Sequence, residues 1–483
     1  MVNKQDFKKV EKYVYEIPKS FRPDMRVPAR LYADEELLDM ALRDRSVEQL
    51  VNTATLPGVV KYTLAMPDIH QGYGPPIGGV IPLRTSDGVI SPGAVGYDIN
   101  CGVRVLRSNI LAEEVKPIMG DIVNALFRGV PSGVGRSGDI RLSNRQMDEV
   151  LERGSAWAVS QGYGTKDDLE HTEERGGMAG AEARAVSSKA KKRGQDQLGT
   201  LGSGNHFVEV GEVEEVYDEE VAEAFGLFKG QMVVWVHSGS RGLGHQVCTD
   251  YVHDLQKAVT KYNIQLPDRE LVCAPFDSPE GRDYFAAMAS AANYAWANRQ
   301  ILSHRVRQIL DDVLAGVVKD RELTLVYDVA HNIAKVEEYR VDGKLTKLII
   351  HRKGATRAFG PGMEVLPADY RDVGQPVLIP GDMGTASYVL VGTTEAMEKT
   401  FGSSCHGAGR VMSRSAAIKK IRGQELQQEL SEKGIVVQGG SWKGLAEEAP
   451  DAYKDVDRVV NVVHSTGIAR KVARLVPLGV IKG

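Results

Sequence analysis

Asp98 and Cys101 lie three residues apart within a glycine-rich stretch at residues 93–102, and together they could bind a metal ion. A turn or a helix start would place both side chains on one side of the chain. A thiolate prefers borderline or soft metals, and a carboxylate beside it extends that preference towards manganese. A thiolate can also bridge two ions. The alternative interpretation of Cys101 is a small buried apolar residue, which is the usual role of a free cysteine.

Three histidines that are far apart in the sequence could complete such a site. His206, His237 and His331 each follow strand-like sequence or a Gly-Ser-Gly turn. Histidine is a common metal ligand, although a lone histidine is more often packed or exposed. Because all three stand beside glycine, serine or asparagine, we expect them to join Asp98 and Cys101 in one thiolate-and-imidazole metal site.

Glycine-rich loops recur after the expected strands, and each carries a polar or ionisable residue. Glycine lets the backbone approach a ligand closely, so that its N–H groups can point at phosphate oxygens. One such loop is a weak indication, because glycine-rich turns and capping residues are common, whereas several favour a shared site. The loops span residues 93–102, 202–209, 236–242, 327–332, 379–384 and 402–410.

His406 differs from the other histidines because it lies just before an expected helix at residues 413–421, with Arg410 and Arg414 nearby. A loop that leads into a helix N-terminus is a natural anion site. The imidazole could act on a phosphate as acid, base or nucleophile, and nucleophilic attack would give a phosphoramidate intermediate. The alternative is a fourth metal ligand or a hydrogen-bond donor to phosphate.

Basic side chains concentrate at residues 351–357. This stretch suits contact with a polyanion, and the alternative is an exposed charged turn. The whole chain has 60 basic and 64 acidic residues, a formal charge of −4. Overall charge therefore does not indicate nucleic-acid binding, although a local basic groove is compatible with it.

A framework of mixed strands and helices must position these loops. Helices are expected at residues 35–51, 245–262, 282–318 (broken once), 413–421 and 456–474, and in part of 141–158 and 166–191. Strands are expected at 231–237, 323–329, 345–351, 377–379 and 388–391, with a tail at 475–483. Strands and helices do not alternate regularly, which favours α+β over a doubly wound α/β fold. We expect one large mixed domain, residues 1–483, with central β-sheets flanked by helices and the active site in glycine-rich loops at strand ends.

Composition favours an intracellular protein. The chain has 483 residues and only four cysteines, without a CxxC pair, which excludes a disulfide scaffold and a zinc ribbon. The N-terminus is polar, and no apolar run approaches the ~18 residues that would cross a bilayer. We therefore expect a cytoplasmic location and no membrane partner.

These loops together resemble the RtcB family of RNA-splicing ligases over essentially the whole chain. The first ninety residues are less diagnostic. The segments that carry the resemblance are residues 96–104, 202–207, 237–242, 328–332, 351–357 and 404–410. They are long, ordered and jointly specific.

The resemblance implies a GTP-dependent ligase that joins an RNA 3′-phosphate, or 2′,3′-cyclic phosphate, to a 5′-hydroxyl. His406 would take GMP from GTP, and the guanylate would pass to the RNA 3′-phosphate, giving RNA-(3′)pp(5′)G, before the 5′-hydroxyl displaces GMP. Two Mn²⁺ ions are implied. Their ligands would be Asp98, Cys101 and His206 for one ion and Cys101, His237 and His331 for the other.

The resemblance also implies a nucleotide pocket and partners. The pocket would comprise Asn205, His206, Phe207, Val208, Glu209, His331, Asn332, Pro380, Gly381, Asp382, Met383, Ser387, His406, Gly407, Ala408, Gly409 and Lys482. Lys482 is one residue from the end of the sequence, so as a guanine contact it predicts a docked tail. Arg241, Lys353 and Arg410 are expected phosphate or RNA contacts. The implied partners are GTP, RNA as tRNA halves or broken RNA, and an archease-type helper protein.

Two other functions would use some of the same residues. A dinuclear metallophosphoesterase acting on RNA ends would share the metal ligands but have no use for a nucleophilic His406 or a guanine pocket. A non-catalytic RNA-processing scaffold would have no need of the complete ligand set.

Overall fold

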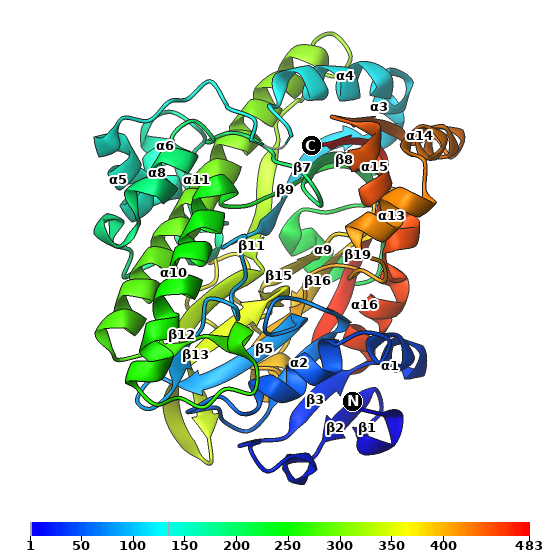
Figure 1. Cartoon of the computed structure of the whole chain (residues 1–483). Helices are drawn as coiled ribbons and strands as arrows, with labels where there is room; N and C mark the ends of the chain where they lie inside the picture. Colours follow the sequence, from blue (N-terminus) through cyan, green and yellow to red (C-terminus); the bar gives the residue numbers. More distant parts are fainter. Residues whose placement is uncertain (1, 134) are drawn as a thin grey trace.

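Two large β-sheets form the centre of the molecule (Figure 1). The structure is a computed structural model that describes residues 2–133 and 135–483. One sheet has seven strands in the order β1-β2-β3-β4-β5-β13-β12. The other has eight, in the order β11-β7-β9-β8-β19-β16-β15 with β18 paired to β19. Most strand pairs are antiparallel, and helices flank the sheets, which confirms the predicted α+β class.

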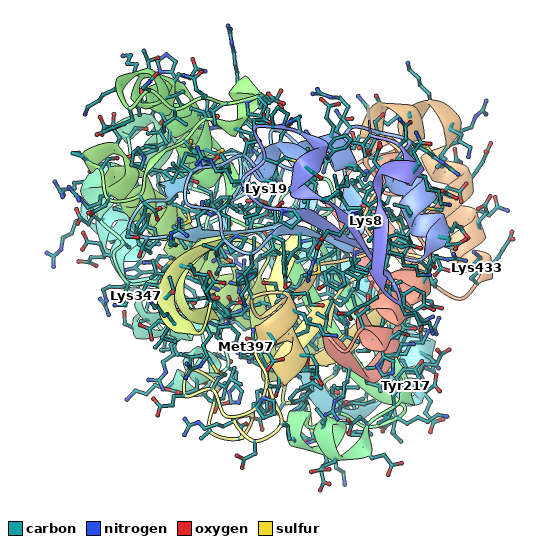
Figure 2. All side chains as sticks on the ribbon, turned by 90° about the horizontal axis from the view of Figure 1, so that it is seen from below. Lys8, Lys19, Tyr217, Lys347, Met397 and Lys433 are labelled. Carbon is teal, nitrogen blue, oxygen red and sulfur yellow. The ribbon has the colours of Figure 1, made fainter. Side chains whose placement is uncertain are left out.

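The seven-stranded sheet combines N-terminal strands with a hairpin from the second half of the chain. Its strands are β1 (Lys8–Glu11), β2 (Val14–Ile17), β3 (Ala29–Tyr32), β4 (Thr63–His70), β5 (Ile77–Arg84), β12 (Asn332–Val341) and β13 (Lys344–Lys353). Figure 2 views the molecule from below, with Lys8 on β1 and Lys347 on the β12–β13 hairpin, both exposed.

The eight-stranded sheet holds the C-terminus in its interior. Its strands are β7 (Gly102–Leu111), β8 (Phe207–Val216), β9 (Gln231–Ser238), β11 (Thr324–Ala330), β15 (Pro376–Ile379), β16 (Ser387–Gly392), β18 (Val436–Gly439) and β19 (Ala469–Lys482). Two short ribbons accompany the sheets: β6 (Val89–Ile90) with β10 (Ala274–Pro275), and β14 (Ala355–Arg357) with β17 (Ser403–Cys405).

The helices cover the outside of both sheets, and α10 and α11 run side by side along one flank (Figure 1). The longer helices are α4 (Met119–Gly129), α5 (Asn144–Arg153), α10 (Arg241–Lys261), α11 (Pro279–Val313), α14 (Gly423–Glu432) and α16 (Val456–Ser465). The shorter ones are α1 (Glu35–Ala41), α2 (Ser46–Thr53), α3 (Ala112–Val115), α6 (Ser155–Ser160), α7 (Lys166–Glu170), α8 (Ser188–Gly194), α9 (Glu219–Phe225), α12 (Thr394–Lys399), α13 (Arg414–Lys420) and α15 (Trp442–Glu447).

Most predicted elements are present, within a few residues of their expected ends. The strand expected at 231–237 is β9, and every residue of β9 is buried, as its apolar sequence requires of a central strand. The helices expected at 245–262 and 413–421 are α10 and α13. The partial helices expected at 141–158 and 166–191 are also present.

Three predictions of helix continuity were wrong. The helix expected at 35–51 is split into α1 and α2, because the Asp44 carboxylate accepts the Ser46 N–H and starts a new helix. The helix expected to break within 282–318 is continuous as α11, whose alanine-rich middle is fully buried against its neighbours. The helix expected at 456–474 ends at Ser465, and the chain then enters β19.

The predicted tail at 475–483 lies almost wholly within β19. This strand pairs with β8, β16 and β18, and its last residue, Lys482, is only 5% exposed. The predicted docking of the tail is therefore present, whereas a contact between Lys482 and guanine stays a prediction. None of the helices within the described ranges is long and apolar enough to cross a bilayer.

Candidate functional site

The predicted metal ligands meet at one edge of the eight-stranded sheet. Because β11, β7, β9 and β8 are antiparallel neighbours, the end of one strand lies beside the start of the next. Cys101 directly precedes β7, and His206 directly precedes β8. His237 lies near the end of β9, opposite Phe207, and His331 directly follows β11.

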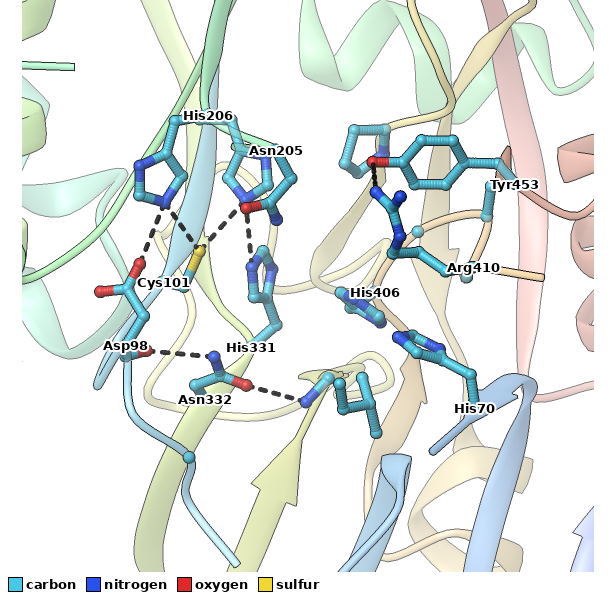
Figure 3. Close-up of a pocket in the computed structure, with 18 of the residues that line it drawn as sticks. His70, Asp98, Cys101, Asn205, His206, His331, Asn332, His406, Arg410 and Tyr453 are labelled. Carbon is cyan, nitrogen blue, oxygen red and sulfur yellow. Dashed lines mark hydrogen bonds and ion pairs between the residues drawn. The ribbon is translucent and has the colours of Figure 1, made fainter. Parts of the chain in front are cut away.

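The ligand atoms converge on two adjoining positions (Figure 3). The Sγ atom of Cys101 lies 3.4 Å from Nε2 of His206 and 3.2 Å from Nε2 of His237. The Nε2 atoms of His237 and His331 are 3.3 Å apart, and Oδ2 of Asp98 is 3.0 Å from Nε2 of His206. Within each three-residue group the ligand atoms lie within 4.8 Å of one another, and Cys101 belongs to both groups.

The chemistry of these donors fits divalent metal ions. Burial holds the pKa of His237 and His331 well below the ordinary value, so both rings are neutral and offer lone pairs. Burial and the charge of Asp98 raise the pKa of the Cys101 thiol, so a thiolate there requires an adjacent cation. Burial opposes ionisation of Asp98, but the hydrogen bond and charge of His206 outweigh it and hold the pKa of Asp98 low.

Arg299 of α11 fixes the strand ends that bear the ligands. Its guanidinium donates to the carbonyl oxygens of Asn100 at 2.7 Å and Ser238 at 3.0 Å, each next in sequence to a predicted ligand. It also pairs with Asp328 at 2.7 Å, and both side chains are completely buried. Removing one partner of a buried ion pair costs roughly 3–5 kcal/mol. Helix α11 therefore holds firmly the strand ends that carry the predicted metal ligands.

Asp98 is held by the turn that leads into α10. The N–H and the hydroxyl of Ser240 donate to its Oδ1 at 3.0 and 3.1 Å. A Cβ atom at Gly239 would lie 2.3 Å from the same oxygen, so only glycine lets the chain pass this closely. On the other side, the side-chain amide of Asn332 donates to the Asp98 carbonyl at 3.0 Å.

His406 follows β17 and faces the metal cluster. Its ring centroid is 5.1 Å from that of His331. The ring Nδ1 lies 2.6 Å from Oδ2 of Asp68, a fully buried carboxylate on β4, and the His406 N–H donates to the same oxygen at 3.0 Å. Asp68 therefore binds Nδ1 of the ring, so that Nε2 is the nitrogen that could react with a substrate.

Lys454 ties Asp68 to the His406 loop. Its buried ammonium donates to the carbonyl oxygens of Pro67 at 3.0 Å and Ile69 at 2.5 Å, on either side of Asp68. The backbone N–H of Lys454 donates to the carbonyl of Gly409 at 2.8 Å. Burial would raise the pKa of Asp68, but the charge and hydrogen bonds of His406, with Lys454 nearby, keep it low, so the carboxylate is ionised.

One cavity of about 440 Å³ is lined both by the predicted metal ligands at the strand ends and by His406. The predicted nucleotide residues that line it are Asn205, His206, Phe207, His331, Asn332, Pro380, Gly381, Asp382, His406, Gly407, Ala408, Gly409 and Lys482. The remaining four, Val208, Glu209, Met383 and Ser387, are buried just behind its wall. The Ser387 hydroxyl, for example, accepts the Gly381 N–H at 3.1 Å and so supports the lining loop.

The part of the cavity around Lys482 has the features of a base pocket. The Lys482 ammonium lies 5.1 Å from the centre of the Phe207 ring. Burial raises the pKa of Glu209 to about 8, outweighing the charge of nearby Lys482. Its Oε1 has no hydrogen-bond partner within residues 2–133 and 135–483, which leaves a buried acceptor or acid to be satisfied.

The three predicted phosphate contacts differ in how far their side-chain donors are already bound to other protein groups. Arg241, the first residue of α10, lines the cavity and donates from Nε to Thr200 at 3.0 Å. Lys353 also lines it, but its ammonium is held by the carbonyls of Tyr73 and Pro75. All three guanidinium nitrogens of Arg410 already bind protein groups, including the Tyr453 hydroxyl at 3.1 Å.

The basic stretch at 351–357 is not an exposed turn, so that alternative was wrong. It belongs to β13 and β14, and its side chains are buried. Arg352 pairs with Glu337 at 2.6 Å, and Arg357 pairs with Glu174 at 2.8 Å. Arg352 and Arg357 therefore form ion pairs inside the protein. Lys353 is the one basic side chain of residues 351–357 that lines the cavity.

Several cavity residues were not predicted from the sequence. They are His70, Tyr73, Tyr97, His245 and Tyr453, together with Asp68 behind His406. The loop at residues 70–74, His-Gln-Gly-Tyr-Gly, fits the same glycine-rich pattern as the others and could have been included. Asp68, an acid inside an apolar strand, is a second signal, because a buried carboxylate requires a partner. Nothing in the sequence around Tyr453 sets it apart.

A buried cluster of a thiol, imidazoles and a carboxylate that could hold metal ions, beside a histidine oriented by an acid on an α+β framework, has the features of an enzyme active site. Residues 49–483 match the family model described as tRNA-splicing ligase RtcB. The chain is 58% identical over 476 residues to the tRNA-splicing ligase RtcB of Archaeoglobus fulgidus and to that of Thermococcus kodakarensis, covering 99% of this chain and 98% of each relative. It is 51% identical over 475 residues to that of Methanococcus maripaludis, covering 98% and 99%. The chain belongs to the RtcB family.

Proposed function

We propose that this protein is a cytoplasmic RNA ligase of tRNA splicing or RNA repair. It joins an RNA 3′-phosphate or 2′,3′-cyclic phosphate to a 5′-hydroxyl at the expense of GTP. The family supports RNA ligation. The contact that supports this chemistry best is the 2.6 Å hydrogen bond between Asp68 and Nδ1 of His406, beside the metal cluster.

His406 is the nucleophile in this proposal. With Nδ1 bound to the Asp68 carboxylate, the lone pair of Nε2 attacks the α-phosphorus of GTP and the bond to pyrophosphate breaks. The product is a phosphoramidate between Nε2 and GMP. The carboxylate stabilises the positive charge that the ring gains on attack, as an acid does behind a catalytic histidine.

Two transfers then complete the reaction. An oxygen of the RNA 3′-phosphate attacks the phosphorus of the guanylate, the bond to Nε2 breaks, and RNA-(3′)pp(5′)G forms. The 5′-hydroxyl of the second strand attacks the 3′-phosphorus, loses its proton, and GMP leaves. Activation is needed because a phosphate monoester lacks a good leaving group, and GMP provides one.

Asp98, Cys101 and His206 would hold one Mn²⁺, and Cys101, His237 and His331 a second. When bound, such ions neutralise phosphate charge and orient the attacking and leaving oxygens. Arg241 at the cavity wall adds a fixed positive charge to the same phosphates.

The guanine base is assigned to the end of the cavity lined by Phe207, Asp382 and Lys482. Glu209 and Ser387, immediately behind this wall, supply acceptor oxygens once the wall adjusts around the base. The substrates are GTP and RNA ends, such as tRNA halves or broken RNA, and an archease-type helper protein would assist guanylation.

The decisive experiment incubates the metal-loaded protein with GTP labelled at the α-phosphate. We expect an acid-labile label on the wild-type chain and none on His406→Ala, with metal content unchanged. His253→Ala is the matched control, because His253 is exposed on α10 outside the cavity. Absence of label on the metal-loaded wild type would contradict the proposal and favour a metallophosphoesterase. Retention of cellular function by His406→Ala would favour a non-catalytic scaffold.

A further inference from the structure

A group of three partly or fully exposed rings, Tyr73, Tyr97 and His245, lines the cavity, and Tyr97 directly precedes the predicted metal ligand Asp98. The ring centroids of Tyr73 and Tyr97 are 5.6 Å apart with an interplanar angle of 71°. Those of Tyr97 and His245 are 6.3 Å apart at 34°. Figure 3 shows Asp98, the next residue after Tyr97, on the opposite side of the cavity from Arg410 and Tyr453.

Buried and partly buried side chains fix the backbone from which the Tyr73 ring projects. The ammonium of the buried Lys353 donates to the carbonyls of Tyr73 at 2.5 Å and Pro75 at 2.8 Å. The N–H of Gly74, between them, donates to the Glu270 carboxylate at 2.7 Å. A buried lysine and a glutamate thus fix a loop whose central side chain remains accessible, as expected of a preorganised binding surface.

The loop that presents Tyr97 is similarly fixed. Gly96 has a φ of +101°, and its N–H donates to the Pro92 carbonyl at 2.9 Å. Asp98, on the other side of Tyr97, is anchored by Ser240. Neither loop backbone therefore needs to be ordered when a ligand binds, which lowers the entropic cost of stacking.

We propose that Tyr73, Tyr97 and His245 form a stacking subsite for the base of the RNA nucleotide that carries the 3′-phosphate. This inference rests on the proposed ligase function and extends it to RNA recognition. Aromatic rings bind any base through its flat face, at roughly 1–3 kcal/mol per base, without reading sequence. A ligase that joins ends of varied sequence requires this kind of contact.

Continuity with His406 assigns the subsite to the 3′-phosphate strand. Ile77, at the end of the Tyr73 loop, lines the cavity and meets Gly354, where an added Cβ would lie 2.2 Å from Ile77 and 3.0 Å from His406 Cε1. The cavity floor therefore runs from the Tyr73 loop directly to the nucleophile. A base stacked on Tyr73 and Tyr97 would direct its 3′-phosphate across this floor to His406 and Asp98.

The test measures binding of short fluorescent RNAs to the manganese-loaded protein without GTP. Two 3′-phosphorylated RNAs are compared, one with a normal terminal nucleotide and one whose terminal nucleotide is abasic. Wild type should bind the normal end more tightly by on the order of tenfold. Tyr73→Ala and Tyr97→Ala should lose this preference, whereas Tyr73→Phe and Tyr97→Phe should keep it.

The matched control is Tyr217→Ala, an exposed tyrosine stacked on Tyr388 away from the cavity, which should keep the wild-type preference. Equal binding of normal and abasic 3′ ends by wild type would overturn the subsite. So would a preference that survives both alanine variants. Because GTP is absent, these outcomes are separate from failure of guanylation, which would contradict the proposed function itself.

Discussion

Cys101 is the residue on which the proposed metal site depends most, because its sulfur belongs to both candidate ligand groups. The spacing of Asp98 and Cys101 identified it from sequence, since a thiol and a carboxylate in one glycine-rich loop are a metal-type pair. The sequence could not show that the Nε2 atoms of His237 and His331 would lie 3.3 Å apart. That depends on the pairing of β11, β7 and β9, which is remote in sequence.

Cys101→Ala should therefore weaken metal binding at both positions. Loss of a shared thiolate removes a ligand from each group, and the remaining histidines and carboxylate give incomplete sites. Calorimetric titration with Mn²⁺ measures this directly, with Cys273→Ala as control, since Cys273 is also buried but outside the cavity. One ion retained at full affinity would refute the shared role.

Asp68 is the most informative single residue that sequence reasoning missed. Asp68→Asn keeps the size of the side chain but removes the charge behind His406 and favours the wrong ring tautomer. The rate of guanylation should fall by roughly a hundredfold or more. Rapid-quench measurement of label transfer from GTP checks this, with the exposed Asp277→Asn as control. A wild-type rate in Asp68→Asn would mean that the carboxylate does not act through His406.

At the scale of the elements, β19 departs most from the sequence-based expectation. Val456 to Arg474 contains apolar residues at helical spacing, which predicted one helix, but Gly467 takes a positive φ of 75° and ends it. The strand that follows is central rather than peripheral because β8 and β16 flank it. Pairing partners at least 43 residues away in the sequence decided its structure, and the local pattern does not contain them.

Ile481→Ala tests whether the end of β19 is part of the core. Ile481 is completely buried in the cluster formed around β8 and α4, so truncation should cost about 2–5 kcal/mol of unfolding free energy. Leu345→Ala is the matched control, because Leu345 is 64% exposed and its loss should change stability by less than about 0.5 kcal/mol. Chemical denaturation of both variants compares them, and equal stabilities would contradict a docked C-terminus.

Glu209 on β8 predicts a pH dependence of stability. Its pKa is raised from 4.5 to about 8 by burial, so between these values the folded protein retains a proton that the unfolded chain has lost. Its contribution to stability therefore falls as pH rises through this range, by about 1.4 kcal/mol per pH unit, and is constant above it. The unfolding free energy of wild type relative to Glu209→Gln should decline from pH 5 to pH 8. A difference that does not change with pH would exclude a protonated Glu209.

At the scale of the whole molecule, the two sheets divide the chemistry between them. The eight-stranded sheet supplies the strand ends that carry the predicted metal ligands, whereas β4 of the seven-stranded sheet supplies Asp68 behind His406. The α+β class and the glycine-rich loops were predictable because they depend on local composition. The meeting of the two sheets at one cavity was not, since it depends on contacts such as those of Arg299 and Lys454 between distant segments. That the whole chain folds as one domain stays a prediction.

The fate of the RNA phosphorus tests the central claim most directly. An RNA labelled in its 3′-phosphate is incubated with a 5′-hydroxyl RNA, GTP, Mn²⁺ and the protein. If the cavity transfers guanylate from His406 to the 3′ end, the label should appear in the new internal phosphodiester, protected from phosphatase, and His406→Ala should give no such product. Release of the label as inorganic phosphate, with the strands unjoined, would contradict ligation and identify the metal cluster as that of a phosphoesterase.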